Sequence, residues 1–252
     1  MISFFRKRFP FLRPFYAIAR NWRLKLLKWR PTYNSHELIT SHLCEFRKDQ
    51  RFKKSYDISF SNGHTIGSIP DEWREYVACW AGEHSMNLEG DFIECGVARG
   101  FTSRMVMEYL NFGSLKRKFY LIDTYKGLDP RYFTENDRTR SFFYPDMYEF
   151  VKNAFAKFAN AVIVKGAVPE VLEKLPKIKN VAFLHIDMNC MIPEIAAAEY
   201  FWPKMSKGAI MLLDDYGHQG FDEQRLAFDK FAKEKGVPIL SLPTGQGLII
   251  KN

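Results

Sequence analysis

The chain has 252 residues, of which 46% are hydrophobic and 26% charged, so it can build a sizeable core and is not globally disordered. It contains no run of about 18 uncharged apolar residues, so we expect no membrane-spanning helix, and its N-terminus lacks the apolar segment of a signal peptide. The net charge of +8 is uneven, because residues 1–54 hold 14 Lys or Arg against 3 Asp or Glu, whereas the rest of the chain holds 23 against 26.

Residues 1–60 are predicted to form a basic, aromatic N-terminal extension, followed by a main domain over residues 61–252. The first thirty residues carry nine basic side chains and no acid, interleaved with Phe, Tyr and Trp. This mixture suits an anionic membrane surface or a docking partner, and it also suits nucleic acid. A solvated arm is the third interpretation. We expect a cytoplasmic protein, and a membrane role would place it peripherally at the inner face of the membrane.

From residue 71 onward, segments with helical spacing alternate with short apolar segments typical of buried strands. Residues 59–70 are expected to form a loop. We predict helices over 71–86, 102–112, 147–158, 169–175, 193–205 and 222–235. We predict strands over 90–97, 118–124, 161–166, 181–187 and 208–216, followed by a hairpin of PILSLP and GLIIK. This order predicts a doubly wound, Rossmann-like α/β fold whose mostly parallel sheet has an antiparallel edge.

Polar or acidic residues close all five predicted parallel strands. In an open α/β sheet, ligands bind beyond the carboxyl ends of the strands. A carboxylate that caps the following helix explains any one of these residues, but it is a poor explanation for all five. The strand-end residues are Glu94 with Gly96 and Gly100, Asp123, Lys165 with Gly166, Asp187, and Asp214 with Asp215.

The turn ECGVARG, after the first of these strands, favours a ribose-containing cofactor. Gly96 and Gly100 permit a tight turn and a close approach of the backbone to a ligand. Because Val97 and Ala98 follow Gly96, the turn is not the G-x-G-x-x-G fingerprint of nicotinamide cofactors. Asp123, at the end of the next strand, is placed to accept hydrogen bonds from two ribose hydroxyls.

A second pattern, three carboxylates at the ends of two further strands, favours a metal site. Asp187 and the pair Asp214–Asp215 are expected to end neighbouring strands, which lie about 4.8 Å apart. Clustered carboxylates repel unless they are protonated or bridged by a cation, and oxygen ligands suit Mg²⁺. Carboxylates that merely cap loops and helices are the alternative. The four cysteines form no CxxC pair and are predicted to be buried free thiols.

Several motifs occur together in an order and spacing that resembles a known family. They are GDFIECGVARGFTS, LIDTYKGL, VKG, LPKIKNVAFLHIDMN and GAIMLLDDYGHQG. Over about residues 64–252 the chain resembles the macrocin O-methyltransferase (TylF-type) family of class I S-adenosylmethionine-dependent methyltransferases. The resemblance implies a seven-stranded sheet with an antiparallel last strand. It also implies methyl transfer to a sugar hydroxyl of a glycan, glycolipid or glycosylated natural product.

The resemblance also implies roles for individual residues. S-adenosylmethionine would be bound by Glu94, Gly96, Val97, Gly100, Ser103, Asp123, Gly166 and Asp187. In this set Glu94, Gly96 and Gly100 would contact the methionine portion, Asp123 the ribose, and Gly166 would lie near the adenine. Mg²⁺, which binds two adjacent hydroxyls of the acceptor, would be held by Asp187, Asp214 and Asp215.

The chain departs from the family at Asn189, where the family usually carries the second acid of an HIDxD motif, proposed as a general base. An amide cannot take up a proton at ordinary pH. Three accounts remain: the metal activates the hydroxyl sufficiently by itself, His218 acts as the base, or transfer activity is reduced or lost. His218 as an ordinary surface residue is the simpler interpretation of that histidine.

Residues 125–146 form a segment of about 22 residues without clear periodicity, a length typical of a lid or binding loop. Its Arg138 and Arg140, with its aromatic residues, are candidates to close over cofactor and acceptor. Equal protease sensitivity with and without cofactor would count against this hypothesis.

Two other functions remain as alternatives. A nucleic-acid methyltransferase would explain the basic extension, but the chain lacks the [DN]-P-P-[FY] motif and its main domain is net acidic. A non-catalytic binding module is the other alternative, motivated by Asn189. The sequence leaves open the acceptor and the oligomeric state, a homo-oligomer included.

Overall fold

The computed structural model describes residues 31–35, 38–65, 71–138 and 145–252. The chain divides into two compact units, Met1–Glu45 and Phe46–Asn252. Residues 1–30 lie outside the described residues, so docking of the basic segment on a membrane, a partner or nucleic acid stays a prediction. Among the described helices, none is long and apolar enough to cross a membrane.

The segment before the main sheet contains more regular structure than we predicted. In the first unit, β1 (Tyr33–Ser35) pairs antiparallel with β2 (Leu38–Thr40). In the second unit, α3 (Gln50–Ser61) begins at Asp49, whose side chain accepts a hydrogen bond from the Arg51 N–H at 2.7 Å. The predicted loop over 59–70 is therefore wrong for its first residues, because they complete this helix. A functional boundary at residue 60 stays a prediction.

The second unit is built on a seven-stranded sheet with the order β5-β4-β3-β6-β7-β9-β8. Strands β3 to β7 pair in parallel, and β9 is antiparallel to both of its neighbours. This confirms the predicted fold class, including the antiparallel edge. The strands are β3 (Asp91–Cys95), β4 (Phe119–Asp123), β5 (Ala161–Lys165), β6 (Val181–Ile186), β7 (Met205–Leu213), β8 (Leu240–Ser241) and β9 (Gly247–Ile250).

The predicted helices are present, with one exception. The segment 169–175 forms turns and a single 3-10 turn, η5 (Leu172–Lys174), because the N–H groups of Leu172, Lys174 and Leu175 donate to carbonyls three residues earlier instead of four. The longer helices are α4 (Glu72–Ser85), α5 (Phe101–Tyr109), α7 (Tyr148–Phe155), α8 (Met191–Phe201) and α9 (Asp222–Lys235). Short elements are η2 (Glu45–Lys48), η3 (Phe112–Ser114), η4 (Pro130–Tyr132), α6 (Glu135–Arg138) and η6 (Trp202–Lys204).

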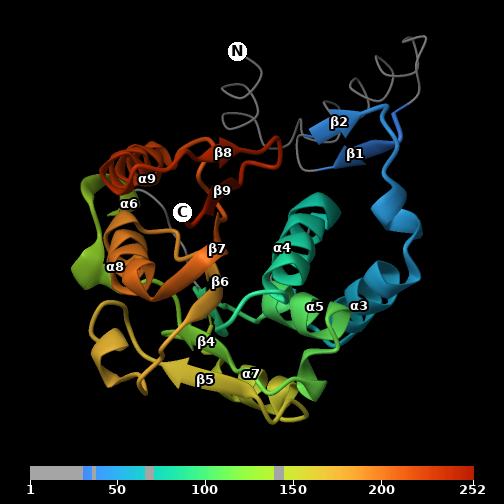
Figure 1. The fold of residues 1–252 in the computed structure, drawn as a ribbon, viewed down its shortest axis with the longest axis horizontal. Coiled ribbons are helices and arrows are strands. Elements are labelled where there is room, and N and C mark those ends of the chain that lie inside the picture. Colours follow the sequence, from blue (N-terminus) through green and yellow to red (C-terminus); the bar gives the residue numbers. More distant parts are fainter. Residues whose placement is uncertain (1–30, 36–37, 66–70, 139–144) are drawn as a thin grey trace. The chain divides into compact units, whose positions relative to one another are not determined.

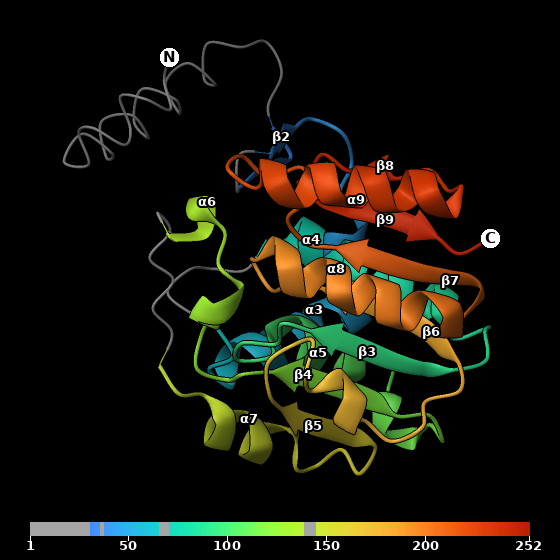
Figure 2. The same ribbon diagram turned by 90° about the vertical axis from the view of Figure 1, so that its left-hand side faces the viewer.

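Helices cover both faces of the sheet, with α3, α4 and α5 on one side and α8 and α9 on the other (Figures 1 and 2). The α8–α9 face packs an apolar core that includes Leu184, Phe201 and Phe228, all at most 1% exposed. Each such side chain contributes about 1.5–3 kcal/mol relative to an exposed position. The two layers hold the carboxyl ends of the strands in a fixed arrangement.

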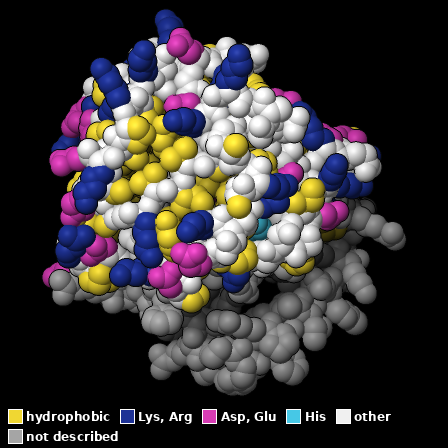
Figure 3. Space-filling view, turned by 90° about the horizontal axis from the view of Figure 1, so that it is seen from below, with side chains coloured by type: hydrophobic (Ala, Val, Ile, Leu, Met, Phe, Trp, Pro, Cys, Tyr) yellow, Lys and Arg dark blue, Asp and Glu magenta, His cyan; other side chains and the backbone are white. Residues whose placement is uncertain are grey.

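Strand β5 lies at one edge of the sheet, and Figure 3 views the unit from this edge. Hydrophobic side chains form a continuous area there, bordered by Lys, Arg, Asp and Glu. All of β5 except Lys165 is only half-buried. An uncovered edge strand can pair with another chain, but a homo-oligomer stays a prediction.

Candidate active site

A cavity of about 260 Å³ opens at the carboxyl ends of the parallel strands. Its wall comes mainly from the ends of β4, β5 and β6 and from the segments that follow them. Of the predicted site residues, the wall includes Gly96, Asp123, Gly166, Asp187 and Asn189. Among the described residues, the wall does not include the other predicted site residues, which are Glu94, Val97, Gly100, Ser103, Asp214, Asp215 and His218.

The two glycines after β3 are required by contacts within the chain. Gly96 has a φ of +90°, and a Cβ there would overlap the carbonyl group of Asp187. Gly100 has a φ of +76°, and a Cβ there would lie 2.7 Å from the ring of Phe155. We expected these glycines to let a ligand approach the backbone closely. In the structure they let segments of the chain approach each other, Gly96 against the residue that follows β6 and Gly100 against α7. Cofactor contacts of both glycines stay predictions.

Asp123 is fixed at the cavity wall by three backbone donors. Its Oδ2 accepts hydrogen bonds from the N–H groups of Val97 and Ala98, at 2.6 and 2.7 Å. Its Oδ1 accepts one from the N–H of Tyr125 at 2.6 Å. Ala98 and Tyr125 both have positive φ, at 50° and 60°. The carboxylate thus ties the turn after β3 to the turn after β4, and its remaining lone pairs can still accept hydrogen bonds.

Glu94 ends β3 as a buried carboxyl that contacts His185 and is not part of the cavity wall. It is 2% exposed, and its Oε1 lies 2.8 Å from Nδ1 of His185, its partner in the parallel register of β3 and β6. The His185 Nε2 lies 3.6 Å from Oδ1 of Asp214. Burial alone would lower the pKa of His185, but the nearby carboxylates of Asp214 and Glu94 raise it well above its usual range. Glu94 therefore links the end of β3 to Asp214, a connection that sequence reasoning missed.

Val97 and Ser103 are also buried, at 4% and 0% exposed. Val97 lies in the turn after β3, and its backbone N–H donates to Asp123. The Ser103 Oγ, in α5, has no hydrogen-bond partner among the described residues. Contacts of either residue with a cofactor stay predictions.

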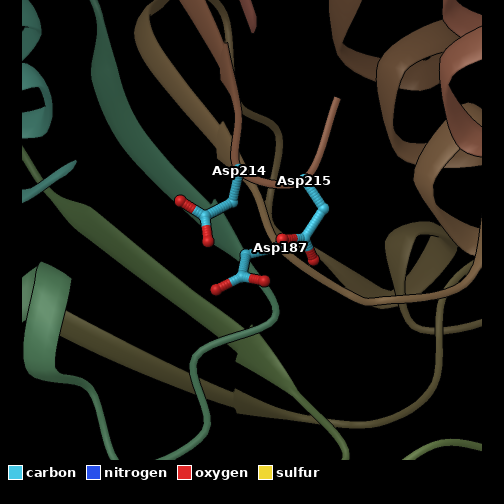
Figure 4. Close-up of side chains that lie close together, drawn as sticks. All are labelled: Asp187, Asp214 and Asp215. Carbon is cyan, nitrogen blue, oxygen red and sulfur yellow. The ribbon is translucent and has the colours of Figure 1, made fainter. Parts of the chain in front are cut away.

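Three carboxylates converge beside the cavity, as Figure 4 shows. Asp187 follows β6 and Asp214 follows β7, and the predicted adjacency of these strands is confirmed. Asp187, Asp214 and Asp215 each offer an oxygen, and these oxygens lie within 4.8 Å of one another. One hard cation with oxygen ligands at about 2.0–2.6 Å can bridge such a set.

The protonation of this cluster is uneven. Burial, together with Asp214 and Asp215, raises the pKa of Asp187 well above its usual range. Burial and Asp214 likewise raise the pKa of Asp215. Burial would also raise that of Asp214, but Arg74 and His185 hold its pKa below the usual range. A bound cation would remove the repulsion that keeps Asp187 and Asp215 from ionising, so the donor set fits a divalent metal.

Arg74 is a member of this cluster that the sequence did not reveal. Its Nη2 forms ion pairs with Oδ2 of Asp214 and, at 3.2 Å, with Oδ1 of Asp215. Asp214 also accepts a hydrogen bond from Nε2 of Gln246 at 3.0 Å. Arg74 and Gln246 lie far from Asp214 in the sequence, so no local residue spacing indicated these contacts.

Asn189 lines the cavity and contacts the cluster. Its backbone is left-handed, with a φ of 55°, a conformation in which Asn is enriched. Its Nδ2 donates to Oδ1 of Asp187 at 3.1 Å. The preceding Met188 N–H donates to Oε1 of the buried Glu194 at 3.2 Å, which fixes the loop. Asn189 can therefore orient Asp187, but it offers no proton acceptor of carboxylate strength.

His218 is exposed, and the described wall of the cavity does not include it. Its backbone N–H donates to the Asp215 carbonyl at 3.1 Å, and its ring packs edge-on against Phe221 with centroids 5.6 Å apart. The Nδ1 lies 3.3 Å from the carbonyl of Gln219. The histidine is thus attached to the cluster through its backbone, and its role as a base stays a prediction.

The segment 125–146 contributes Gly127, Leu128, Asp129 and Tyr132 to the cavity wall. It contains the short elements η4 and α6, and Asp137 of α6 is 1% exposed. The Asp137 carboxylate accepts hydrogen bonds from Thr134 and from the Cys190 thiol, the latter at 3.3 Å. The Arg138 side chain and Arg140 lie outside what is described, so the lid stays a prediction. The four cysteines are free thiols, as predicted, but only three are buried, because Cys44 is partly exposed.

Several solved structures resemble most of this chain. The O-methyltransferase NovP is 15% identical, with a TM-score of 0.66, over 80% of this chain and 98% of NovP. The calicheamicin methyltransferase CalS11 is 16% identical, with a TM-score of 0.57, over 87% of this chain and 98% of CalS11. An O-methyltransferase from Bacillus cereus, solved in complex with SAH, is 9% identical with a TM-score of 0.53, over 81% and 91% of the two chains. At these identities the likeness supports the fold.

The sequence profile of the macrocin O-methyltransferase (TylF) family matches residues 32–240. No curated protein matches the chain. The profile begins earlier than the resemblance we had placed from about residue 64, so part of the predicted extension lies within the family region. With its sheet order and its cavity at the strand ends, the chain belongs to the macrocin O-methyltransferase (TylF) family and is an S-adenosylmethionine-dependent O-methyltransferase.

Proposed function

We propose that the protein is a Mg²⁺-dependent O-methyltransferase that acts on a sugar hydroxyl with a second hydroxyl beside it. The acceptor would be part of a glycan, a glycolipid or a glycosylated natural product. The observation that carries this proposal is the position of Asp187, which lines the cavity and also belongs to the three-carboxylate cluster. Cofactor and metal-bound acceptor would therefore meet at one residue.

The cofactor would occupy the cavity between Asp123 and Asp187. Asp123 would accept hydrogen bonds from the ribose, Gly166 would lie against the adenine, and Gly96 would lie beside the methionine portion. When bound, S-adenosylmethionine supplies an electrophilic methyl group. Of the other proposed cofactor residues, Glu94, Val97, Gly100 and Ser103, the first two would act through His185 and Asp123, which they contact.

The acceptor would bind at the carboxylate cluster. Asp187, Asp214 and Asp215 would hold the Mg²⁺, and Asn189 would keep Asp187 oriented through its hydrogen bond of 3.1 Å. When bound, the metal lowers the pKa of a coordinated hydroxyl, which reduces the need for a strong protein base. His218 is the protein group proposed to receive the proton. If His218→Gln leaves kcat unchanged, the proton leaves to solvent instead.

Known relatives support a sugar acceptor. CalS11 is described as a TDP-rhamnose 3'-O-methyltransferase. The basic, aromatic residues 1–30, outside the described residues, are proposed to bring the enzyme to a lipid-linked acceptor at the inner face of the membrane. If removal of residues 1–30 leaves binding to anionic vesicles unchanged, the membrane part of the proposal is wrong.

The test is turnover of S-adenosylmethionine with a panel of glycans, with and without EDTA. Each glycan that contains a pair of neighbouring hydroxyls is matched by its monodeoxy analogue. We expect methyl transfer only to the diol, loss of transfer with EDTA, and recovery with Mg²⁺. Metal-independent transfer would contradict the role of the cluster, and cofactor binding without turnover on any diol would favour a non-catalytic module.

A further inference from the structure

Arg74 is directed at the carboxylate cluster by the start of α4. The helix begins at Asp71, which is 5% exposed and whose side chain accepts a hydrogen bond from the Trp73 N–H at 2.8 Å. This cap fixes the first turn of α4, and the helix packs against β6 and β7. The long side chain of Arg74 therefore reaches the ends of these two strands from a rigid element.

The guanidinium of Arg74 makes three contacts with two of the proposed metal ligands. Nη2 donates to the backbone carbonyl of Asp214 at 2.7 Å, to Oδ2 of Asp214, and to Oδ1 of Asp215 at 3.2 Å. The side chain of Arg74 is 20% exposed, and those of its partners are 16% and 11% exposed. At this burial the ion pairs are shielded from water and are stronger than surface pairs.

The other oxygen of Asp214 is also engaged. Oδ1 accepts from Nε2 of Gln246 at 3.0 Å and lies 3.6 Å from Nε2 of His185. The donor recorded at Asp187, in contrast, is the neutral amide of Asn189. The guanidinium of Arg74 thus contacts the Asp214–Asp215 side of the cluster directly, whereas Asp187 has a neutral amide as its donor.

We infer that Arg74 is a tethered cation that holds Asp214 and Asp215 in place without metal and competes with a divalent ion for their oxygens. The inference rests on the proposed metal site. Competition follows from two features: Arg74 occupies lone pairs that a metal ligand must offer, and its charge repels a second cation at a distance of a few ångström. The site should then bind metal more weakly than three bare carboxylates, and the protein should fold without metal.

The test is Mn²⁺ binding to the full-length, metal-stripped protein, measured by calorimetry, with Arg74→Met as the principal variant. Methionine keeps the apolar stem and removes the charge. We expect Arg74→Met to bind Mn²⁺ at least about tenfold more tightly than the unmodified chain. We also expect its thermal midpoint to fall without metal and to recover with Mn²⁺. Arg225→Met is the matched control, because within the described part of the chain Arg225 forms ion pairs with acids of α9 alone. It should change neither the affinity for Mn²⁺ nor the thermal midpoint.

A second variant guards against misfolding. Arg74→Gln keeps a donor for Asp214 but removes the charge, so it should also bind Mn²⁺ more tightly. If both variants bind with unchanged or weaker affinity while the unmodified chain binds Mn²⁺, the inference is wrong and the metal site stands. If only the variants bind, the inference stands and the metal site of the unmodified chain is wrong. If none binds, both are wrong.

Discussion

The two ends of the site are held by different forces. At the cofactor end, Asp123 is fixed by three backbone N–H groups, from Val97, Ala98 and Tyr125. At the acceptor end, Asp214 and Asp215 are held by the guanidinium of Arg74. Backbone donors are neutral and cannot move without unfolding the turns, whereas a side-chain ion pair responds to other charges. If the proposed sites are right, we expect the cofactor end to be preorganised and the acceptor end to respond to bound cations.

The largest effect is expected from Asp187→Asn, which breaks the acceptor end at the residue shared with the cavity. Loss of one charged metal ligand should lower kcat by on the order of 10²–10³-fold. Affinity for S-adenosylhomocysteine, measured by calorimetry, should change little by comparison. The control is Asp222→Asn, an acid whose side chain is 76% exposed. Activity within a factor of two of the unmodified enzyme would refute a metal role for Asp187.

The complementary change, Asp123→Asn, breaks the cofactor end. The new amide cannot accept from all three backbone donors, and each buried donor left unsatisfied costs about 1–3 kcal/mol. We expect affinity for S-adenosylhomocysteine to fall roughly tenfold to a hundredfold. Asp91→Asn is a matched control, because its Oδ1 accepts a backbone N–H at 2.8 Å near the opposite ends of the strands. Equal loss of cofactor affinity in both variants would point to general destabilisation.

Asn189→Asp adds a carboxylate beside Asp187, between the proposed cofactor end and the proposed acceptor end of the site. If the family's base is missing from this chain, the substitution should raise kcat about tenfold or more, since a positioned base commonly contributes 10²–10⁴-fold. Asp tolerates the positive φ of this position. Asn111→Asp, at a φ of 49°, controls for the backbone conformation. An unchanged or lower kcat would mean that the amide of Asn189 is the better group, as a holder of Asp187.

The smallest effect concerns stability and pH. Burial and the nearby Asp214 raise the pKa of Glu75, in α4 close to the acceptor end, from 4.5 to about 8. Between these values the folded protein keeps a proton that the unfolded chain has lost, so Glu75 lowers stability as the pH rises through this window. Relative to the unmodified protein, Glu75→Gln should melt a few degrees higher near pH 8 than near pH 5.

The control for this change is Glu149→Gln, at a side chain that is 72% exposed. Its melting temperature should follow that of the unmodified protein at both pH values. If the melting temperature of Glu75→Gln differs from that of the unmodified protein by the same amount at both pH values, the Glu75 carboxyl does not titrate in this window.

The strand-end acids could be predicted from the sequence because each follows an uninterrupted apolar strand. Asp123, Asp187 and Asp214 were located in this way, and parallel pairing brings the ends of such strands to one edge of the sheet. The family motifs then supplied the cofactor. Helices whose apolar residues recur regularly, such as α8 and α9, were also predicted near their observed positions.

The partners of these acids could not be predicted in the same way. Arg74 reaches Asp214 across 140 positions of the chain, and Gln246 reaches it from the turn before β9. Such contacts depend on the packing of α4 and β9, which no local pattern encodes. Glu94 illustrates a second difficulty, since its position at the end of β3 gave no sign of its contact with His185, which lies 91 positions later in the chain.

The central claim is that Asp187, Asp214 and Asp215 hold one divalent cation beside the cofactor cavity. The most direct test is an anomalous difference map from crystals of the unmodified protein soaked in Mn²⁺. The account predicts a single peak within about 2.0–2.6 Å of an oxygen of each carboxylate. A map without a peak at the cluster, at an Mn²⁺ concentration that saturates the Arg74→Met variant, would contradict it.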